Sequence, residues 1–226
     1  MQMQFEGFYP QTIDIFMGLR LNCNDKPWFE ENKEQFKQYC KLPFELFAKE
    51  INGHVWQYMP EIPLNIHVSR IYKDMRHYTG GARYNDHLWT SCKYAGDEWQ
   101  DRPVYWFGLG PDGYDYGMGY FRNSRQTLDA LRAKIDANPA EFKDKVVNTM
   151  AKQNSFKLSG EKYKRRVADY PEDISEWYHS KDLYIIHKSP LGKELFNRDI
   201  IEQVKHDFDL VRPVYEYLWS LHTDTL

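Results

Sequence analysis

The sequence predicts an α+β fold, in which a central, largely antiparallel sheet is flanked by N-terminal and C-terminal helices. Apolar residues recur at helical spacing near both ends of the chain, whereas residues 62–121 hold short β-prone runs that turn signals separate. No helix-like segment joins these runs, so neighbouring strands should pair antiparallel. Neither an internal repeat nor a linker-like stretch divides the 226 residues, which favours one domain over residues 1–226.

Two helices are expected before the sheet. Apolar residues at helical spacing predict the first over Thr12–Leu21, with Thr12 as its cap. The second covers about Pro27–Asn52, since proline suits the first position of a helix. Pro43 lies inside this pattern and should kink or split the helix, and Gly53 should end it.

The β-prone region predicts four strands. Glycines and aspartates mark the turns between them. The turn Pro111-Asp112-Gly113 lies between two aromatic runs and is the strongest hairpin signal in the chain. The expected strands cover Ile66–Arg76, His87–Tyr94, Val104–Leu109 and Tyr114–Phe121.

Helical periodicity returns after the sheet, with one further strand. Ser124 is a suitable cap for a helix that reaches Ile135, and Pro139 opens another helix. Residues 153–169 are polar, and no element is predicted there. The remaining expected elements are a short helix over Pro171–His179, a strand over Leu183–His187, and a final helix over Arg198–Leu221 that Pro213 should bend.

The composition excludes several classes of protein. The 30 basic and 33 acidic residues give a net charge of −3, whereas a general nucleic-acid-binding protein would be strongly basic. Cys23, Cys40 and Cys92 are odd in number and form no C-x-x-C pair, which indicates free thiols in a reducing cytoplasm. The N-terminus does not resemble a signal peptide, and no apolar run is long enough to cross a bilayer, so a membrane is not an expected partner.

We expect no cofactor and no metal site. None of the eight histidines shares H-x-x-x-H or H-E-x-x-H spacing with another. Gly108, Gly110 and Gly113 match the pattern G-x-G-x-x-G. A strand rather than a helix should follow them, which argues against a dinucleotide-binding site.

The most informative stretch is the expected strand around Asp74. Alternation along a strand would place Arg70, Tyr72, Asp74 and Arg76 on one face. An ordinary half-buried strand alternates apolar with polar residues, so this face suggests a polar site. Guanidinium groups suit carboxylate and phosphate, and Asp74 between them would orient them or act as a base. A structural ladder of ion pairs fits the same residues.

These residues support two hypotheses about function. In the first, the chain is a pocket protein or an enzyme that binds a small anionic ligand bearing phosphate or carboxylate. In the second, it is a non-catalytic binding or scaffold protein in which the same residues form a structural polar network. The sequence predicts no reaction, substrate or oligomeric state. The first hypothesis assigns Asp74 to catalysis, Arg70, Lys73 and Arg76 to holding the anion, Tyr84 to lining the pocket, and Lys164 and Arg165 to closing it.

The same stretch resembles a bacterial family of conserved hypothetical proteins, the domain of unknown function 2461. The family pattern Arg-x-x-Arg-Asp-x-Arg-Phe, followed by Asp-Lys-x-x-Tyr, is similar to residues 70–77 and 80–84 here. Weaker similarities follow in the right order along most of the chain, at residues 24–29, 117–135 and 160–182. The resemblance implies an α+β cytoplasmic protein of about this length, and it implies no activity.

This chain departs from the family pattern at three places. Lys73 replaces the second arginine, which keeps the charge but loses the two-pronged guanidinium. His77 replaces the phenylalanine, and Gly80-Gly81 replaces the Asp-Lys pair, for whose lysine Arg83 could substitute. Two glycines restrain a loop poorly, so we expect this loop to be flexible and to border the predicted pocket; a tight turn that only connects two strands fits the same residues.

Overall fold

The computed structural model, which describes residues 3–74, 81–163 and 169–225, contains a six-stranded antiparallel sheet. The strand order is β1-β2-β3-β4-β6-β5, and every neighbouring pair runs antiparallel, so the predicted α+β class is confirmed. The strands are β1 (Leu64–Val68), β2 (Leu88–Tyr94), β3 (Val104–Gly110), β4 (Gly113–Gly119), β5 (Lys157–Ser159) and β6 (Tyr184–Pro190).

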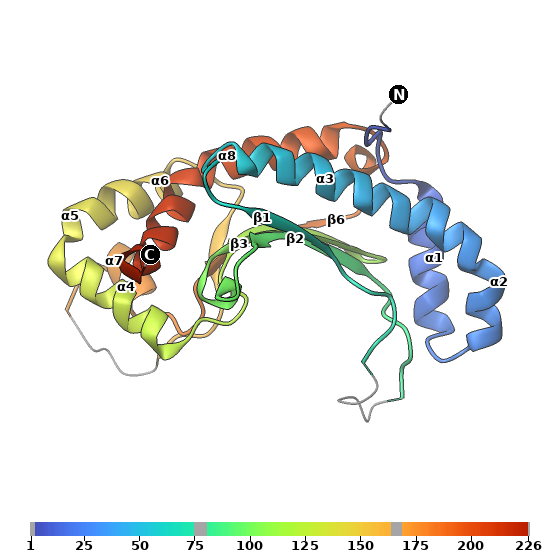
Figure 1. The fold of residues 1–226 in the computed structure, drawn as a ribbon, viewed down its shortest axis with the longest axis horizontal. Helices are drawn as coiled ribbons and strands as arrows, with labels where there is room; N and C mark the ends of the chain where they lie inside the picture. The colour runs from blue at the N-terminus through green and yellow to red at the C-terminus, as the bar shows by residue number, and fades with distance from the viewer. Residues whose placement is uncertain (1–2, 75–80, 164–168, 226) are drawn as a thin grey trace.

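The helices cover one face of the sheet and both of its ends. Two long helices, α3 and α8, lie side by side over the outer face, while α1 and α2 stand at one end and α4 to α7 at the other (Figure 1). The result is an arch whose inner sheet face none of the described helices covers (Figure 1). The helices are α1 (Pro10–Leu21), α2 (Lys26–Phe36), α3 (Leu42–Trp56), α4 (Arg125–Ala137), α5 (Pro139–Phe142), α6 (Asn148–Ala151), α7 (Glu172–Tyr178) and α8 (Asp199–Trp219).

The alternation of side chains along β3 explains this one-sided architecture. Tyr105, Phe107 and Leu109 are each 1% exposed and point into the helical layer, where the ring of Phe107 lies 4.4 Å from that of Phe47 on α3. The alternate residues Trp106 and Gly108 are half-buried and face the inside of the arch. One face of the sheet is therefore a dense aromatic core, and the other is free to form a site.

The break predicted at Pro43 occurs as a π-helical turn, Lys37–Lys41, between α2 and α3. Proline has no N–H, so it cannot donate to the carbonyl of Tyr39, four residues earlier. The hydroxyl of Thr12 donates to that carbonyl instead, and it accepts a hydrogen bond from the N–H of Tyr9. The prediction that Thr12 caps the first helix is wrong, because Tyr9 occupies the N-cap and Thr12 lies inside the helix.

Most other predicted elements are confirmed to within a few residues. Ser124 caps α4, and Pro111-Asp112 forms the two-residue loop between the paired Gly110 and Gly113. Gly53 does not end its helix, because α3 continues to Trp56 with Ile51 and Val55 packed in the core. Strand β5 was not predicted. Pro213 lies within α8 without ending it, and none of the described helices has the length and apolar character needed to cross a bilayer.

The three thiols differ in exposure, which predicts their reactivity. Cys40 and Cys92 are 0% and 3% exposed, and burial raises the pKa of Cys92 to about 12, whereas Cys23 is half-buried in the turn after α1. Because the thiolate is the reactive form, a disulfide reagent should modify Cys23 in the native protein and all three thiols after unfolding. A colorimetric thiol count measures this, with Cys23→Ser as the control that should show no fast reaction. Rapid modification of two or more native thiols would contradict the burial of Cys40 and Cys92.

Candidate functional site

The described residues of the basic motif, 70–74, lie in an arm that leaves the sheet after β1. The arm consists of residues 69–74 and 81–87, and it hangs beyond the end of the sheet beside α1 and α2 (Figure 1). The N–H of Lys73 donates to the carbonyl of Arg83 at 2.9 Å, and the N–H of Asn85 donates to that of Ile71 at 2.8 Å. The base of the arm is also tied to the turn after α1, where the carbonyl of Cys23 accepts from the N–H of Arg83.

The predicted strand Ile66–Arg76 is therefore wrong over residues 69–74, because β1 ends at Val68, and its last two residues lie outside the described chain. The adjacent strand β2 begins only at Leu88, so the sheet offers these residues no continuous ladder. In the described part of the arm they pair with the returning limb instead, through a bridge between Tyr72 and Tyr84.

The structure brings together only part of the predicted site. Tyr84 is 2% exposed, and its ring stacks on Phe29 of α2 at 4.6 Å, so it packs the base of the arm. Arg70 and Asp74 are exposed, and Lys73 is half-buried. The other predicted residues, Arg76, Gly80, Lys164 and Arg165, lie outside the described residues.

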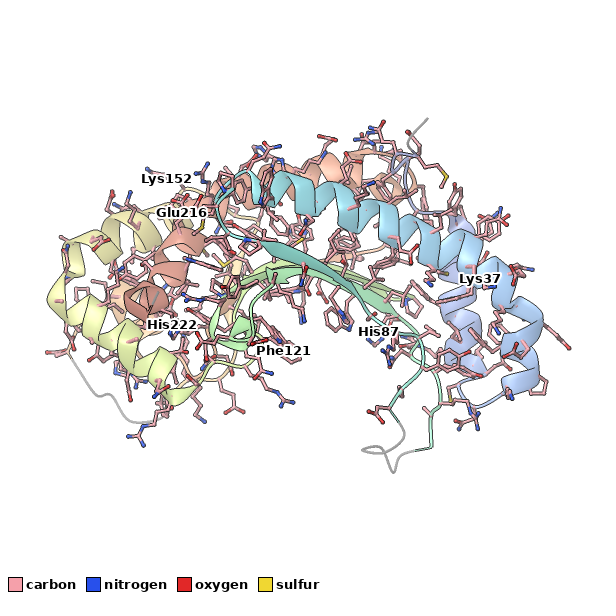
Figure 2. The ribbon with its side chains drawn as sticks, in the orientation of Figure 1. Lys37, His87, Phe121, Lys152, Glu216 and His222 are labelled. Carbon is pink, nitrogen blue, oxygen red and sulfur yellow. The ribbon has the colours of Figure 1, made fainter. Side chains whose placement is uncertain are left out.

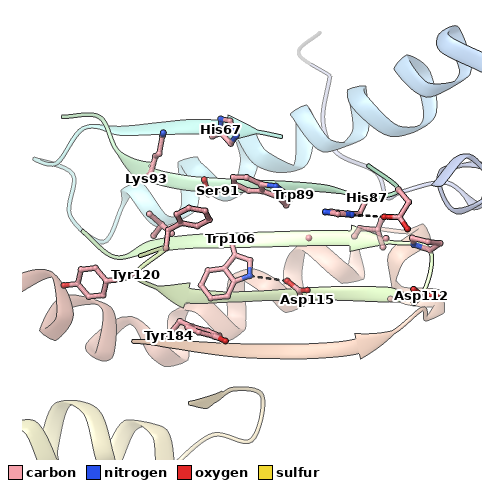
Figure 3. Close-up of a pocket in the computed structure, with 18 of the residues that line it drawn as sticks. His67, His87, Trp89, Ser91, Lys93, Trp106, Asp112, Asp115, Tyr120 and Tyr184 are labelled. Atoms are coloured by element: carbon pink, nitrogen blue, oxygen red, sulfur yellow. Dashed lines mark hydrogen bonds and ion pairs between the residues drawn. The ribbon is translucent and has the colours of Figure 1, made fainter. Parts of the chain in front are cut away.

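A cleft of about 800 Å³ occupies the inner face of the sheet. Its lining comes from α1, from β1 to β4, from the start of β6 and from the loops that join them. Figure 2 shows His87 near one end of this face and Phe121 near the other. Figure 3 shows side chains rising from neighbouring strands into the cleft, and those that the argument uses are His67, His87, Trp89, Lys93, Trp106 and Asp115.

The floor of the cleft is made of glycine. In the register of the sheet, Trp89 on β2 lies opposite Gly108 on β3, which lies opposite Asp115 on β4. A Cβ atom at Gly108 would lie 3.4 Å from the carboxylate of Asp115 and 3.7 Å from the Cβ of Trp89. Gly110 and Gly113 continue the floor toward the hairpin. The three glycines of the G-x-G-x-x-G pattern therefore leave a slot between an indole ring and a carboxylate.

Trp106 closes one side of this slot. Its ring covers Gly117, at which a Cβ atom would lie 2.7 Å from the indole. The indole N–H donates to Asp115 Oδ1 at 3.2 Å. Burial raises the pKa of Asp115, against the opposing effects of this hydrogen bond and of the positive charges of Lys188 and His87.

Charged groups hold the hairpin end of the cleft together. Arg20 of α1 donates to Asp86 at 2.7 Å and forms two hydrogen bonds with Asp112, at 2.8 and 2.6 Å. His87 Nδ1 lies 3.0 Å from Asp86 Oδ1. Burial acts to raise the pKa of Asp86, but the hydrogen bonds from His87 and Arg20 outweigh it, so this pKa is lowered.

The other end of the cleft is cationic. Lys93 Nζ lies 3.9 Å from the centroid of the Trp99 ring, and no carboxylate in the described part of the chain pairs with it. His67 on β1 lies opposite Ser91 on β2. Burial lowers the pKa of His67, and the positive charges of Lys93 and Arg70 lower it further. The predicted motif thus reaches the cleft electrostatically through Arg70.

Sequence reasoning missed most residues of this cleft, although two signals pointed to it. Along β2, the residues Trp89, Ser91 and Lys93 alternate with Leu88, Thr90 and Cys92, which face the helices, and this alternation marks a second face. Glycines at alternate positions of β3 and β4 mark a face without side chains. Within residues 3–74, 81–163 and 169–225, no three His, Cys, Asp or Glu side chains are grouped to hold a metal ion, and the expected lack of a metal site stays a prediction.

The charged cluster predicts how stability depends on pH. The lowered pKa of Asp86 means that its contribution to stability is complete above its unfolded pKa of about 4 and disappears as pH falls through the lower folded value. The Asp86→Asn variant should therefore have a lower melting temperature than the wild type at pH 7. Its melting temperature should also fall less than that of the wild type when the pH is lowered from 5 to 2. Asp144→Asn, at an exposed position, is the matched control. Equal losses in all three proteins would contradict the role of Asp86.

Comparison with known proteins identifies the family but no activity. No curated protein matches the chain. The family model of the conserved hypothetical protein DUF2461 matches residues 11–217, which include both the arm and the cleft. The match covers most of the sequence, as the motif of the arm led us to expect. The chain therefore belongs to the DUF2461 family of conserved hypothetical proteins.

Proposed function

We propose that this protein binds a small anionic molecule that carries a flat ring, and that it does so in the cleft on the inner face of the sheet. The observation that carries the proposal is the row Trp89–Gly108–Asp115, in which glycine leaves a slot between an aromatic wall and a carboxylate. Small-molecule sites combine apolar and aromatic walls with a few placed polar groups, which is the composition of this cleft.

The slot suits the face of a ring. The backbones of Trp89 and Asp115 lie two strand spacings, or about 10 Å, apart, and the carboxylate of Asp115 reaches over Gly108 toward Trp89. A planar group can lie on the exposed backbone of Gly108 and Gly110 and contact the indole of Trp89 or Trp106. The carboxylate of Asp115 can then accept a hydrogen bond from the edge of the ring.

The cationic end supplies the partner for the anion. Lys93 offers an ammonium group without a carboxylate partner among the described residues, and Ser91 and His67 line the cleft beside it. Arg70 lies beyond the other end of β1 and adds its positive charge to the surroundings of His67. An ammonium of this kind acts as a point charge for carboxylate or phosphate, so the predicted anion would bind at the Lys93 end of the cleft, away from the arm.

The alternative hypothesis, a structural role, is favoured for one part of the motif. The burial of Tyr84 against Phe29 and the hydrogen bonds to Cys23 show that the base of the arm is packed as a structural unit. We therefore propose that the arm positions Arg70 near the cleft. We also propose a reducing compartment, the cytoplasm, as the location, because the three cysteines are free.

The role of Lys93 predicts a defined pattern of affinities. AMP has a ring and a phosphate, adenosine has the ring alone, and ribose 5-phosphate has the phosphate alone. By thermal shift and calorimetry, AMP should bind more tightly than either fragment. Lys93→Gln should weaken AMP binding about tenfold or more, since a hydrogen bond to a charged group contributes about 1.5–3 kcal/mol.

Lys49→Gln is the matched control for this prediction, since Lys49 is exposed on α3, which covers the opposite face. Its AMP affinity should equal that of the wild type. If AMP, adenosine and ribose 5-phosphate all fail to bind, the proposed function is wrong. Equal weakening in both lysine variants would exclude a specific role for Lys93.

The glycine floor predicts the effect of one added methyl group. Gly108 has ordinary strand geometry, and a Cβ atom there makes only van der Waals contacts, so Gly108→Ala should fold normally. The methyl group should nevertheless fill the slot and weaken AMP binding about tenfold, because overpacking typically costs about 1–3 kcal/mol. Denaturant unfolding and calorimetry measure the two effects separately.

Gly53→Ala is the control for Gly108→Ala. Nothing lies within 4 Å of a Cβ atom at Gly53, which is an exposed position inside α3. This substitution should stabilise the fold by about 0.5–1 kcal/mol and leave ligand affinity unchanged. Unchanged affinity in Gly108→Ala as well would show that the ligand does not lie on the glycine floor.

A further inference from the structure

We infer that the cleft is an active site in which His87 and Asp115 act as general base and general acid on the bound molecule. The inference rests on the proposed function, since it requires that a ligand lie on the glycine floor. It goes beyond binding because it assigns a reaction class: proton transfer between carbon and oxygen in a ring-bearing anion that has a carbonyl group with a neighbouring C–H bond.

His87 has the environment of an oriented imidazole. Its Nδ1 lies 3.0 Å from Asp86 Oδ1, and Asp86 accepts a hydrogen bond from Arg20 at 2.7 Å. Arg20 is in turn held by its two bonds to Asp112 on the hairpin. A carboxylate at Nδ1 favours the tautomer with the proton on that nitrogen, which leaves Nε2 as the acceptor. No other described side chain forms a hydrogen bond with this imidazole.

Asp115 has the opposite environment. It is half-buried between Trp106 and the glycine floor, and the indole N–H occupies only one of its two oxygens. Burial favours the neutral carboxylic acid over the carboxylate, and the pKa of Asp115 is raised accordingly. Asp86, by contrast, has a lowered pKa. Two carboxyl groups whose environments shift their pKa values in opposite directions are typical of an acid and the partner of a base.

The register of the sheet places the two groups over one part of the floor. A Cβ atom at Gly110 would lie 3.2 Å from the Cβ of His87, and one at Gly108 would lie 3.4 Å from Asp115 Oδ1. These glycines are two residues apart on β3, or about 7 Å. Figure 3 shows both side chains on the same face. A small molecule on the floor is therefore within reach of both groups.

The proposed step balances without a further reactant. Nε2 of His87 takes the proton from the carbon next to the carbonyl, and the electron pair of the broken C–H bond forms a C=C bond. The π pair of the carbonyl moves to its oxygen, which takes the proton of Asp115. The product is the enol, and the enzyme is left with an imidazolium and a carboxylate. Proton exchange with water restores both groups, so no oxidant or reductant takes part.

Phenylpyruvate is a suitable probe, because it combines a ring, a carboxylate and a ketone next to an acidic CH₂ group. Proton NMR in buffered D₂O follows the replacement of the CH₂ hydrogens by deuterium, with buffer alone as the blank. The wild type should accelerate this exchange. His87→Asn and Asp115→Asn should each reduce the enzymatic rate about 100-fold or more, while phenylpyruvate binding by calorimetry changes less than threefold.

The matched controls are His206→Asn and Asp144→Asn, at exposed positions on α8 and in the turn between α5 and α6. Both should exchange at the wild-type rate. If phenylpyruvate binds but the exchange rate equals that of buffer alone, the inferred activity is wrong and the binding proposal stands. The same conclusion follows if the double variant of His87 and Asp115 still exchanges at the wild-type rate. If AMP binds and phenylpyruvate does not, the assigned substrate class is wrong. If neither binds, both proposals fail.

Discussion

The rings of Tyr105, Phe107 and Tyr116 point from the sheet into the layer formed by α3 and α8, where none is more than 1% exposed. Each aromatic side chain of this size removes a large apolar area from water, so the packing of this layer dominates the stability of the fold. Side chains alternate along a strand, so when these aromatic residues face the helices, the residues next to them in the sequence must face the inner side of the sheet. The cleft exists because the core needs only one face of the sheet.

A buried polar contact sets how the last helix lies on that sheet. The hydroxyl of Tyr116 donates to Asp207 Oδ2 of α8 at 2.6 Å and accepts from the amide of Gln203 at 3.0 Å. The imidazole of His187 stacks on the same ring at 4.6 Å. Buried polar groups favour a single arrangement, because any shift that separated them would leave them unpaired. The contact thus ties α8 to β4, whose opposite face carries Asp115.

Local signals predicted most of the fold, and they failed where contacts between distant residues decide the structure. Pro111-Asp112 and Ser124 each act within a few residues of themselves, so their turn and cap were foreseeable. The strand expected through Arg70 fails because a strand needs a neighbour, and none extends that far. Gly53 predicts the end of a helix, but the core contacts of Ile51 and Val55 stabilise the helix on both sides of it.

The candidate site was harder to predict for the same reason. The basic residues were conspicuous because they are adjacent in the sequence, whereas Trp89, Gly108 and Asp115 become neighbours only through strand register. A glycine contributes to a site because it has no side chain. The space that this leaves can be recognised only when the positions of the flanking side chains are known. The arm lies at the His87 end of the cleft, and the cleft itself is built from residues with no motif of their own.

The glycines of the inner face differ in how freely evolution can replace them. A side chain at Gly117 would collide with the backbone of Ile185, and one at Gly113 with that of Ser189, so the fold itself demands glycine at both places. Gly108 meets no such obstacle. Natural selection can therefore reshape the slot at Gly108 while the scaffold stays constant. A lineage that acquires a new ligand has one position at which the shape of the site changes without a change of architecture.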